Sequence, residues 1–437
     1  MKILMLTNVY TPQIGGVTRS VELFSNEMRQ QGHQVKIVAP EYERMPPGEK
    51  DVIRVAAIPK FYQNQYPLPV PVVSALLPHI HEFAPDIVHV HHPFLLGSTG
   101  QAIAAECHVP LVYTHHTRYS VYIETKTNWP RPIEEGIVEM ILGFCELTNG
   151  IIAPSQGIAD LLKEHGVTTE IVVIPTGVDL KKFSKGNGSK IRKQEGIPED
   201  AFVVGHVGRL AVEKNCRFLV RSIREFLKQR PDAHIVVVGD GPERAALEET
   251  LNEGTTSGQV HFLGFREGQD LIDCYHSFDL FAFASHSETQ GMVLAEAMAA
   301  GSAVLAVHGT GVSDIIVDGE NGRIIEKDDE QAYVAALNEL YEEFKANGKL
   351  MPEGVRKTAE HYSQTQCATK VLNLYERLIA EQRTARNDEW ELMQQRWEAG
   401  WNRWRNRARA VAAAARETFT LQPAGDVRNQ DTLYSGP

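Results

Sequence analysis

Two carboxylates with a spacing suited to ligand chemistry, Glu288 and Glu296, lie in the segment 286–301, which reads HSETQGMVLAEAMAAG. The apolar run before this segment predicts a buried strand, and the strong helix formers after Gly291 predict a helix that ends near Gly301. Glu288 is therefore expected in a loop and Glu296 inside the helix. At ~1.5 Å per residue, Glu296 lies less than ~10 Å from the helix start. One carboxylate could meet a sugar and the other a ribose.

The backbone between these carboxylates predicts an anion site. Near Gly291, Met292 and Val293 the first amides of the helix lack intrahelical acceptors, and a glycine lets a ligand approach the backbone closely. The segment therefore resembles a cradle for a nucleotide sugar. The alternative is an ordinary loop glutamate and an ordinary surface-helix glutamate, because two glutamates at this spacing are a weak signal alone.

Cations and glycines follow other strand-like runs. Arg209 and Lys214, in GRLAVEKN, come just after an apolar run and suit the neutralisation of a leaving diphosphate. Gly15 and Gly16 follow the first apolar run and could bring backbone donors to the same diphosphate. Surface charge and a tight turn are the alternatives for these two motifs.

Histidine pairs end two further strand-like runs: His91 with His92, and His115 with His116. A zinc site has to be considered, but the pairs are adjacent in sequence and no third ligand has the usual spacing, so a sugar-binding role is preferred. The chain contains no DxD motif, the commonest device for holding a nucleotide diphosphate through a divalent metal. No metal and no cofactor is therefore expected, and cations with backbone amides take the metal's place.

The supporting elements alternate between strand and helix signals in two successive sets. This pattern predicts two doubly wound parallel sheets, with ligands bound outside the carboxyl ends of their strands in the cleft between domains. The expected divisions are 1–180, 181–364, a helix over 365–383 and a tail over 384–437. KGNGSK, residues 185–190, is interpreted as a linker between the sheets.

Composition excludes several classes of protein. A net charge of −12 argues against a general nucleic-acid binder, and five dispersed cysteines suit a reducing cytoplasm. No apolar run approaches the ~18 residues of a membrane span, and no secretory cleavage pattern follows the start. A dinucleotide oxidoreductase is disfavoured because no GxGxxG follows a strand.

Six segments of the chain, taken together, resemble the family-4 retaining glycosyltransferases of the GT-B fold over roughly residues 1 to 380. The segments are GGVTRS, THH, GRLAVEK, VVGDGP, LGF and ETQGMVLAEAMAAG. The resemblance implies two facing Rossmann-like domains, with the donor held by the second, the acceptor by the first, and a last helix that crosses back to the first. It also implies a route in which the leaving phosphate acts as base on the same face of the sugar.

The resemblance also implies a role for each matching residue. Arg209 and Lys214 would contact the diphosphate, and Glu288 the hydroxyls of the donor sugar. Glu296 would bind the ribose and the segment around Phe265 the base. His116 would lie near the sugar, and Gly16 matches the glycine loop that closes over the phosphates.

Within the family, HHPFLLG and YTHHTRY look most like the lipid transferases that place a hexose on diacylglycerol, so a uridine diphosphate hexose such as UDP-glucose is the expected donor. Transfer to phosphatidylinositol, to a saccharide or to a small soluble acceptor stays open. A nucleotide-sugar 2-epimerase and a non-catalytic nucleotide-sugar sensor are the alternatives from other classes.

The tail over 384–437 holds four of the five tryptophans, and their spacing puts them on one helical face. Residues 394–416 contain six arginines and one acid, a local charge of +5. This composition favours a helix that lies in an anionic membrane interface, which would place the protein at the inner face of the membrane. Docking on the enzyme's own surface or on another subunit is the alternative, and the final stretch is expected to be disordered.

Overall fold

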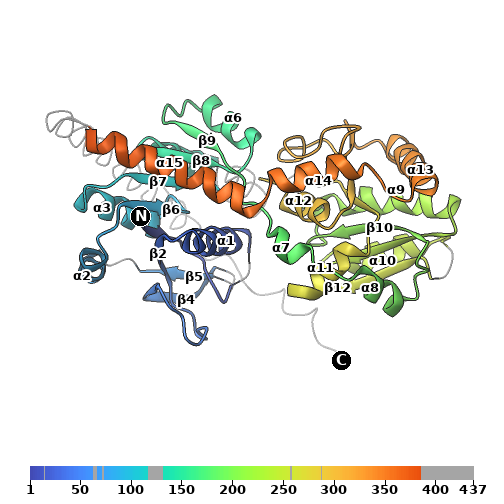
Figure 1. Cartoon of the computed structure of the whole chain (residues 1–437), viewed down its shortest axis with the longest axis horizontal. Helices are drawn as coiled ribbons and strands as arrows, with labels where there is room; N and C mark the ends of the chain where they lie inside the picture. Colours follow the sequence, from blue (N-terminus) through green and yellow to red (C-terminus); the bar gives the residue numbers. More distant parts are fainter. Residues whose placement is uncertain are drawn as a thin grey trace, which may run out of the picture.

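Two parallel sheets, one in each half of the chain, form the framework of the protein (Figure 1). The computed structural model describes residues 1–13, 15–62, 66–70, 73–116, 131–255, 258–286 and 288–384. The predicted tryptophan-rich face and its arginines lie outside these residues. Among the described helices, none is long and apolar enough to cross a membrane.

The first sheet has seven strands in the order β3-β2-β1-β6-β7-β8-β9. Every pair in it is parallel. The strands are β1 (Lys2–Leu6), β2 (Gln34–Pro40), β3 (Val52–Val55), β6 (Ile87–Val90), β7 (Leu111–Thr114), β8 (Gly150–Ala153) and β9 (Ile171–Val173). An antiparallel hairpin, β4 (Ala57–Tyr62) with β5 (Tyr66–Pro69), stands beside it.

Helices cover both faces of this sheet. They are α1 (Gly16–Gln30), α2 (Val73–Phe83), α3 (Leu96–Glu106), α5 (Arg131–Cys145) and α6 (Gln156–Glu164). Side chains from alternate positions of β1 enter two separate cores, Leu4 on one face and Ile3 on the other. Continuous apolar runs such as that of β1 are what a sheet buried on both faces requires.

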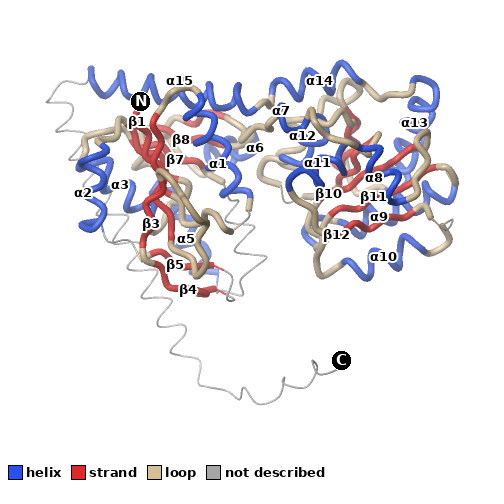
Figure 2. Tube along the Cα trace, turned by 60° about the horizontal axis from the view of Figure 1, so that its bottom comes forward, coloured by secondary structure: helices blue, strands red, loops and turns tan. Residues whose placement is uncertain are grey.

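The second sheet has six strands in the order β12-β11-β10-β13-β14-β15, again parallel throughout. The strands are β10 (Phe202–Val207), β11 (Ala233–Val238), β12 (Val260–Gly264), β13 (Leu280–Phe283), β14 (Ala303–Val307) and β15 (Gly322–Ile325). The helical segments are α7 (Leu180–Phe183), α8 (Gly188–Glu195), η1 (Val212–Lys214), α9 (Cys216–Gln229), α10 (Arg244–Asn252), α11 (Gly268–His276), α12 (Met292–Ala299), α13 (Glu330–Asn347) and α14 (Pro352–His361). The predicted pair of doubly wound parallel sheets is confirmed (Figure 2).

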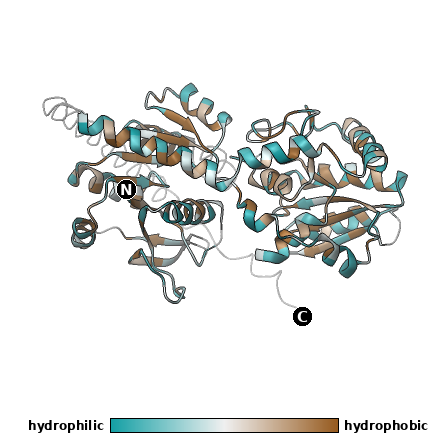
Figure 3. Ribbon diagram, viewed as in Figure 1, coloured by the Kyte–Doolittle hydropathy of each residue, from teal (hydrophilic) through white to brown (hydrophobic). Residues whose placement is uncertain are grey.

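The helices are apolar on the side that faces a sheet and polar on the outside, whereas the strands are mostly apolar (Figure 3). In α9, Phe218, Ile223 and Phe226 are buried against the second sheet, while Arg217 and Arg221 face outward. Full burial of one such side chain stabilises the fold by roughly 1.5–3 kcal/mol. The spacing of apolar residues thus sets which face of each helix points inward.

The last described helix, α15 (Gln364–Thr384), returns to the first domain (Figure 1). It packs beside α1, and Val371, Tyr375 and Leu378 belong to the core on that face of the first sheet. The two segments that connect the domains meet where the backbone amide of Val178 donates a hydrogen bond to the carbonyl of Tyr362 at 2.8 Å. Residues from the beginning and the end of the described chain therefore build one domain.

The predicted linker at residues 185–190 is wrong in its second half. Asn187 accepts a hydrogen bond from the amide of Lys190 at 3.2 Å and so caps α8, which begins at Gly188. An asparagine before a helix is as typical of an N-cap as of a loop, and the packing of α8 on α11 decides between them. The edge strands β3 and β15 were not predicted.

Candidate active site

The predicted donor-site residues gather at the point where the strand order of the second sheet reverses. β10 and β13 are neighbours in the sheet although two strands separate them in sequence, so the loops that leave their carboxyl ends diverge. Such a switch point opens a crevice at the sheet edge. Arg209 follows β10 and Glu288 follows β13, which places a cation and a carboxylate at the same crevice.

Lys214 and Glu288 form an ion pair across this crevice. Their side chains are 26% and 18% exposed, so both remain accessible to solvent. Arg209 is exposed and, within the part of the chain that the structure describes, makes no ion pair. One free cation and one paired cation therefore stand beside the carboxylate.

A small polar cluster holds the loop that carries Glu288. The side-chain amide of Asn215 lies 3.0 Å from His286 Nε2 and 3.0 Å from an oxygen of Asp328. His286 Nε2 also lies 3.0 Å from Asp328. Asn215 has φ 53°, a left-handed conformation that asparagine tolerates better than most residues. This turn sets Lys214 and the loop after β13 side by side.

Gly291 is required by the backbone at the start of α12. Its φ is 71°, and a Cβ there would lie 3.0 Å from the carbonyl oxygen of Gly311. The helix then begins at Met292, so the amides of Met292 and Val293 are among those with no acceptor inside the helix. The predicted strand, loop and helix are thus present in order, with Glu288 in the loop and Glu296 in the helix.

Glu296 is almost completely buried, with 2% of its side chain exposed, and it has two partners. The hydroxyl of Tyr275 from α11 donates to Oε2 at 2.7 Å. Arg19 Nη1 from α1 of the other domain lies 2.6 Å from Oε1. Burial and the neighbouring Glu296 carboxylate raise the pKa of Tyr275 well above its usual range, so Tyr275 stays a donor. A buried carboxylate is thus compensated by one charge and one hydroxyl.

A cleft of about 520 Å³ lies between the two domains. Phe265, which is 61% exposed, lines it from the second domain, and Gly15 with Arg19 lines it from the first. A Cβ added at Gly16, the first residue of α1, would meet nothing within 4 Å. Local packing therefore leaves space at the glycine loop, which is what close approach of a ligand needs.

The four predicted histidines separate into different surroundings. His91 Nδ1 and His116 Nε2 lie 2.9 Å apart, with stacked rings. By contrast, His92 accepts a hydrogen bond from the amide of Asn8 at 3.1 Å, and His115 lies beside the hydroxyl of Tyr113. No three metal-ligating side chains come together within the described ranges.

Burial is the main cause of the lowered histidine pKa values here. It lowers the pKa of His92 to about 4 and, together with neighbouring histidines, takes the pKa values of His91 and His116 well below their usual range. These three imidazoles are therefore neutral at physiological pH. A neutral imidazole has one N–H donor and one acceptor.

Two side chains at this site were missed by the sequence argument. Arg19 stands in the glycine motif, yet nothing local indicates that it reaches a carboxylate of the other domain. Tyr275 carries no motif at all, and its contact with Glu296 arises only because α11 packs against α12.

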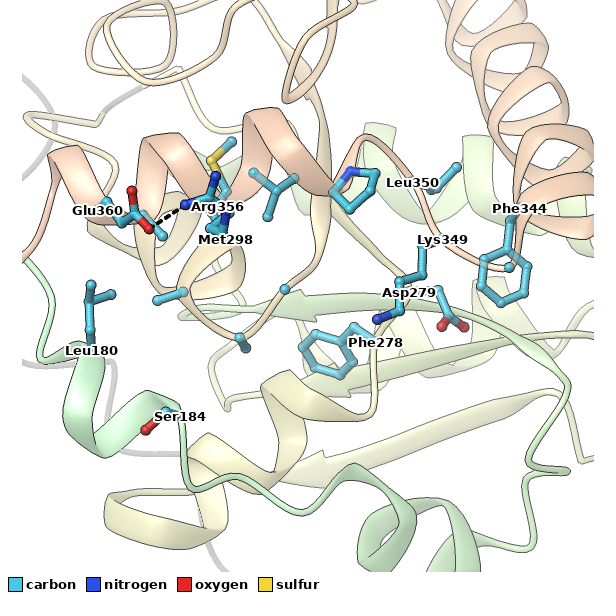
Figure 4. A pocket seen from close by; sticks show the side chains of 17 residues that line it. Leu180, Ser184, Phe278, Asp279, Met298, Phe344, Lys349, Leu350, Arg356 and Glu360 are labelled. Carbon is cyan, nitrogen blue, oxygen red and sulfur yellow. Dashed lines mark hydrogen bonds and ion pairs between the residues drawn. The ribbon is translucent and has the colours of Figure 1, made fainter.

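A second pocket of about 520 Å³ lies between α7, the end of α12 and α14 (Figure 4). Apolar side chains such as Phe278 and Met298 form its walls, and Arg356 pairs with Glu360 at its rim at 2.6 Å. None of the predicted site residues lines it.

Comparison with known families matches both halves of the chain. Residues 14–182 match the model of Glycosyltransferase Family 4, and residues 188–354 match that of Glycosyl transferases group 1. An alpha-monoglucosyldiacylglycerol synthase of Streptococcus pneumoniae is 30% identical over 326 residues, which cover 73% of this chain and 74% of that protein. A GDP-mannose-dependent alpha-mannosyltransferase of Corynebacterium glutamicum is 28% identical over 341 residues, covering 75% and 77%.

Among solved structures, Anabaena HepE in complex with UDP-glucose superposes with a TM-score of 0.66 at 20% identity. The superposition covers 86% of this chain and 99% of that one. At this identity the likeness concerns the fold, and it agrees with the two facing parallel sheets described above.

Proposed function

The chain belongs to the family-4 glycosyltransferases of the GT-B fold, and from that premise we propose that it moves a hexose from a nucleotide-diphosphate sugar to a membrane lipid such as diacylglycerol. The proposed donor is a uridine diphosphate hexose such as UDP-glucose. The proposed reaction retains the configuration at the anomeric carbon and needs no metal.

The observation that carries this proposal is the gathering of opposite charges and free amides at one switch point. Arg209 and Lys214 offer positive charge beside the first amides of α12, and Glu288 lies within contact of Lys214. A glycosyl transfer develops negative charge on the departing diphosphate and positive charge on the sugar ring. The cations with the amides suit the first charge, and the Glu288 carboxylate suits the sugar.

The remaining residues have proposed roles around the same donor. Glu296 takes the ribose hydroxyls, and the exposed segment at Phe265 lies along the base. Gly16 leaves room for the phosphates at the start of α1, and His116 binds the sugar from the first domain.

Each of the two carboxylates is paired with a cation in the unliganded protein, Glu288 with Lys214 and Glu296 with Arg19. At Glu288 the sugar hydroxyls can join Lys214, since both side chains are partly exposed. Glu296 is only 2% exposed, and the ribose reaches its carboxylate by displacing Arg19, the partner from the other domain. We therefore expect Arg19 to leave Glu296 when the donor binds, and its guanidinium is then free to meet a phosphate.

The lipid acceptor is supported by the similarity to the pneumococcal synthase, whose name states that acceptor. A location at the inner face of the membrane follows from the same proposal and from the composition of the tail. Mannosyl transfer is the second candidate, favoured by the similarity to the corynebacterial mannosyltransferase.

The test is a product analysis with the full-length protein. UDP-glucose, UDP-galactose and GDP-mannose are each offered with diacylglycerol in anionic vesicles, with phosphatidylinositol vesicles and with soluble sugars, in the presence of a chelator. We expect a glycosylated diacylglycerol by mass spectrometry, with the donor's anomeric configuration by proton NMR.

Several results would overturn the proposal. Donor epimerisation without an acceptor would indicate an epimerase, and tight donor binding without turnover would indicate a sensor. An inverted product would contradict retention, and activity that returns only with manganese would contradict metal independence.

A further inference from the structure

His116 stands at one end of a row of buried rings that reaches the crossover helix. Its ring stacks on that of His91 at a centroid distance of 5.2 Å, and His91 packs against His89 at 4.2 Å. His89 Nδ1 lies 2.6 Å from the hydroxyl of Tyr375 in α15. His89, His91 and Tyr375 are at most 1% exposed, so the row is shielded from water.

The proton positions on His89 follow from its two partners. Burial raises the pKa of Tyr375 well above its usual range, so its hydroxyl stays protonated and can donate to His89 Nδ1. Burial also lowers the pKa of His89 to about 3, so the ring is neutral, and with Tyr375 as the donor to Nδ1 its proton is on Nε2. That N–H meets Thr114 Oγ1 at 2.6 Å. Tyr375 and Thr114 thereby hold His89 in one orientation and one tautomer.

His91 has one partner and one unpartnered nitrogen. Nδ1 faces His116 Nε2 at 2.9 Å, whereas the buried Nε2 has no hydrogen-bond partner among the described residues. If the proton were on Nε2, an N–H would be buried without an acceptor. If the proton is on Nδ1, only a lone pair is left unpaired, and orphaned N–H groups are the rarer of the two in proteins. With its proton on Nδ1, His91 is the hydrogen-bond donor to His116 Nε2.

We propose that His91 is a positioning residue that donates its Nδ1–H to His116 and so keeps His116 in the Nδ1–H tautomer, with Tyr375 of the crossover helix holding the row through His89. His116 then presents a single N–H donor from Nδ1, because Nε2 is occupied by His91. The catalytic meaning of this arrangement rests on the proposed function, in which His116 binds the donor sugar. An N–H at that place would donate to a sugar oxygen, which the opposite tautomer could not do.

The direct test is the tautomer itself, measured without substrate. Full-length protein labelled with 15N in its histidine rings gives long-range 1H–15N correlations, and the His116 signals are assigned from their loss in His116→Gln. We expect His116 to be protonated on Nδ1 in the wild type and to lose that preference in His91→Leu. In His91→Asn the side-chain amide nitrogen takes the place of Nδ1, so the wild-type tautomer should persist.

The same variants are then assayed for transfer. Loss of one preorganised hydrogen-bond donor at the reacting group typically costs about 10²-fold or more in kcat, so we expect His91→Leu to lower kcat about 100-fold with donor KM changed less than about two-fold. His91→Asn should recover to within about five-fold of the wild type, since one hydrogen bond is kept. Tyr375→Phe should lower kcat about ten-fold, because His89 then loses the donor that fixes it.

His234→Leu is the matched control, because His234 and His261 form another stacked histidine pair, 3.2 Å apart, at the far edge of the second sheet. It should leave kcat and the His116 tautomer unchanged. A wild-type His116 protonated on Nε2 would overturn the inference whatever the activity. So would a His91→Leu protein that folds, loses activity and still shows Nδ1–H on His116. The predicted tautomer with no transfer from any donor would instead leave the inference standing and reject the proposed function.

Discussion

Each carboxylate of the pair separated by seven residues has its own cation, Lys214 for Glu288 and Arg19 for Glu296. The two pairs differ in burial, since Glu288 is 18% exposed and Glu296 only 2%. The exposed pair is partly open to solvent, whereas in the proposed function the buried pair exchanges one partner for another. Two carboxylates of one short segment therefore lie in different electrostatic surroundings.

Glu288→Gln and Lys214→Ala should each abolish transfer while the fold is kept. In the proposed function both side chains face charge that develops at the donor, where loss of one such contact typically costs ~3 kcal/mol or ~100-fold in kcat. Steady-state rates with the purified variants give the answer. Arg221→Ala removes an exposed ion pair with Glu330 at 2.6 Å on the surface and should be fully active. Full activity in either site variant would reject the assignment.

The buried row of histidines should make the first domain sensitive to acid. The unfolded chain binds a proton at His89 below about pH 6.5, whereas burial lowers the pKa of the folded state to about 3. The contribution of His89 to the free energy of unfolding is therefore complete above pH 6.5, and it is lost as the pH falls toward 3. At pH 5 the loss from His89 is about 2 kcal/mol. Urea unfolding of the wild type and of His89→Gln at pH 7 and pH 5 measures this loss of stability. An equal loss between the two pH values in both proteins would show that His89 is not its cause.

At the scale of elements, α12 and α15 connect the site to the rest of the fold. α12 joins the loop of Glu288 to the buried Glu296 within eight helical residues. α15 closes the first domain with residues from the end of the described chain, and Gln382 still donates to the carbonyl of His108 at 2.9 Å near its last turn. A truncation that preserves this domain has to keep α15 whole.

A protein that ends at Thr384 should stay folded but lose binding to anionic vesicles and activity on a lipid acceptor. The removed segment carries the tryptophan face and the +5 charge of residues 394–416, a composition suited to the interface of an anionic membrane. Vesicle co-sedimentation at low and high salt measures the loss, with neutral vesicles as the control. If the truncated and full-length proteins sediment alike, a contact with another subunit becomes the better account of the tail.

At the scale of the whole molecule, the cleft is bridged by side chains as well as by the chain itself. Arg19 reaches Glu296 from one domain to the other, and the amide of Gln156 donates to Asp314 of the second domain. The two segments that connect the domains are joined by the backbone hydrogen bond from Val178 to Tyr362. Among the described residues these contacts join the two domains, and the proposed donor binding would alter that of Arg19.

Arg19→Ala should open the unliganded protein. Removing Arg19 leaves a buried carboxylate without its cation, which costs about 2 kcal/mol and shifts a two-state domain equilibrium by more than ten-fold. Small-angle X-ray scattering should show a larger radius of gyration, which saturating UDP reduces. Arg377→Ala, which loses contacts to Glu170 and Glu381 away from the cleft, should scatter like the wild type. An unchanged radius in Arg19→Ala would show that this bridge does not hold the domains together.

The sequence by itself determined the class of fold and the local setting of the donor motif. Apolar runs and helix periodicity are local signals, so they predicted the alternation of strand and helix, and with it the strand ends that Arg209 and Glu288 follow. The roles of these residues were not determined in this way and came from a family resemblance.

Only the tertiary structure decided which distant side chains meet. Tyr375 reaches His89 across 286 positions, and Arg19 reaches Glu296 from another domain. Such contacts depend on how helices pack on a sheet and on each other, and no short stretch of chain carries that information. For the same reason Asn187 began a helix where its neighbours suggested a linker, because the packing of α8 on α11 outweighed the local preference of the loop residues.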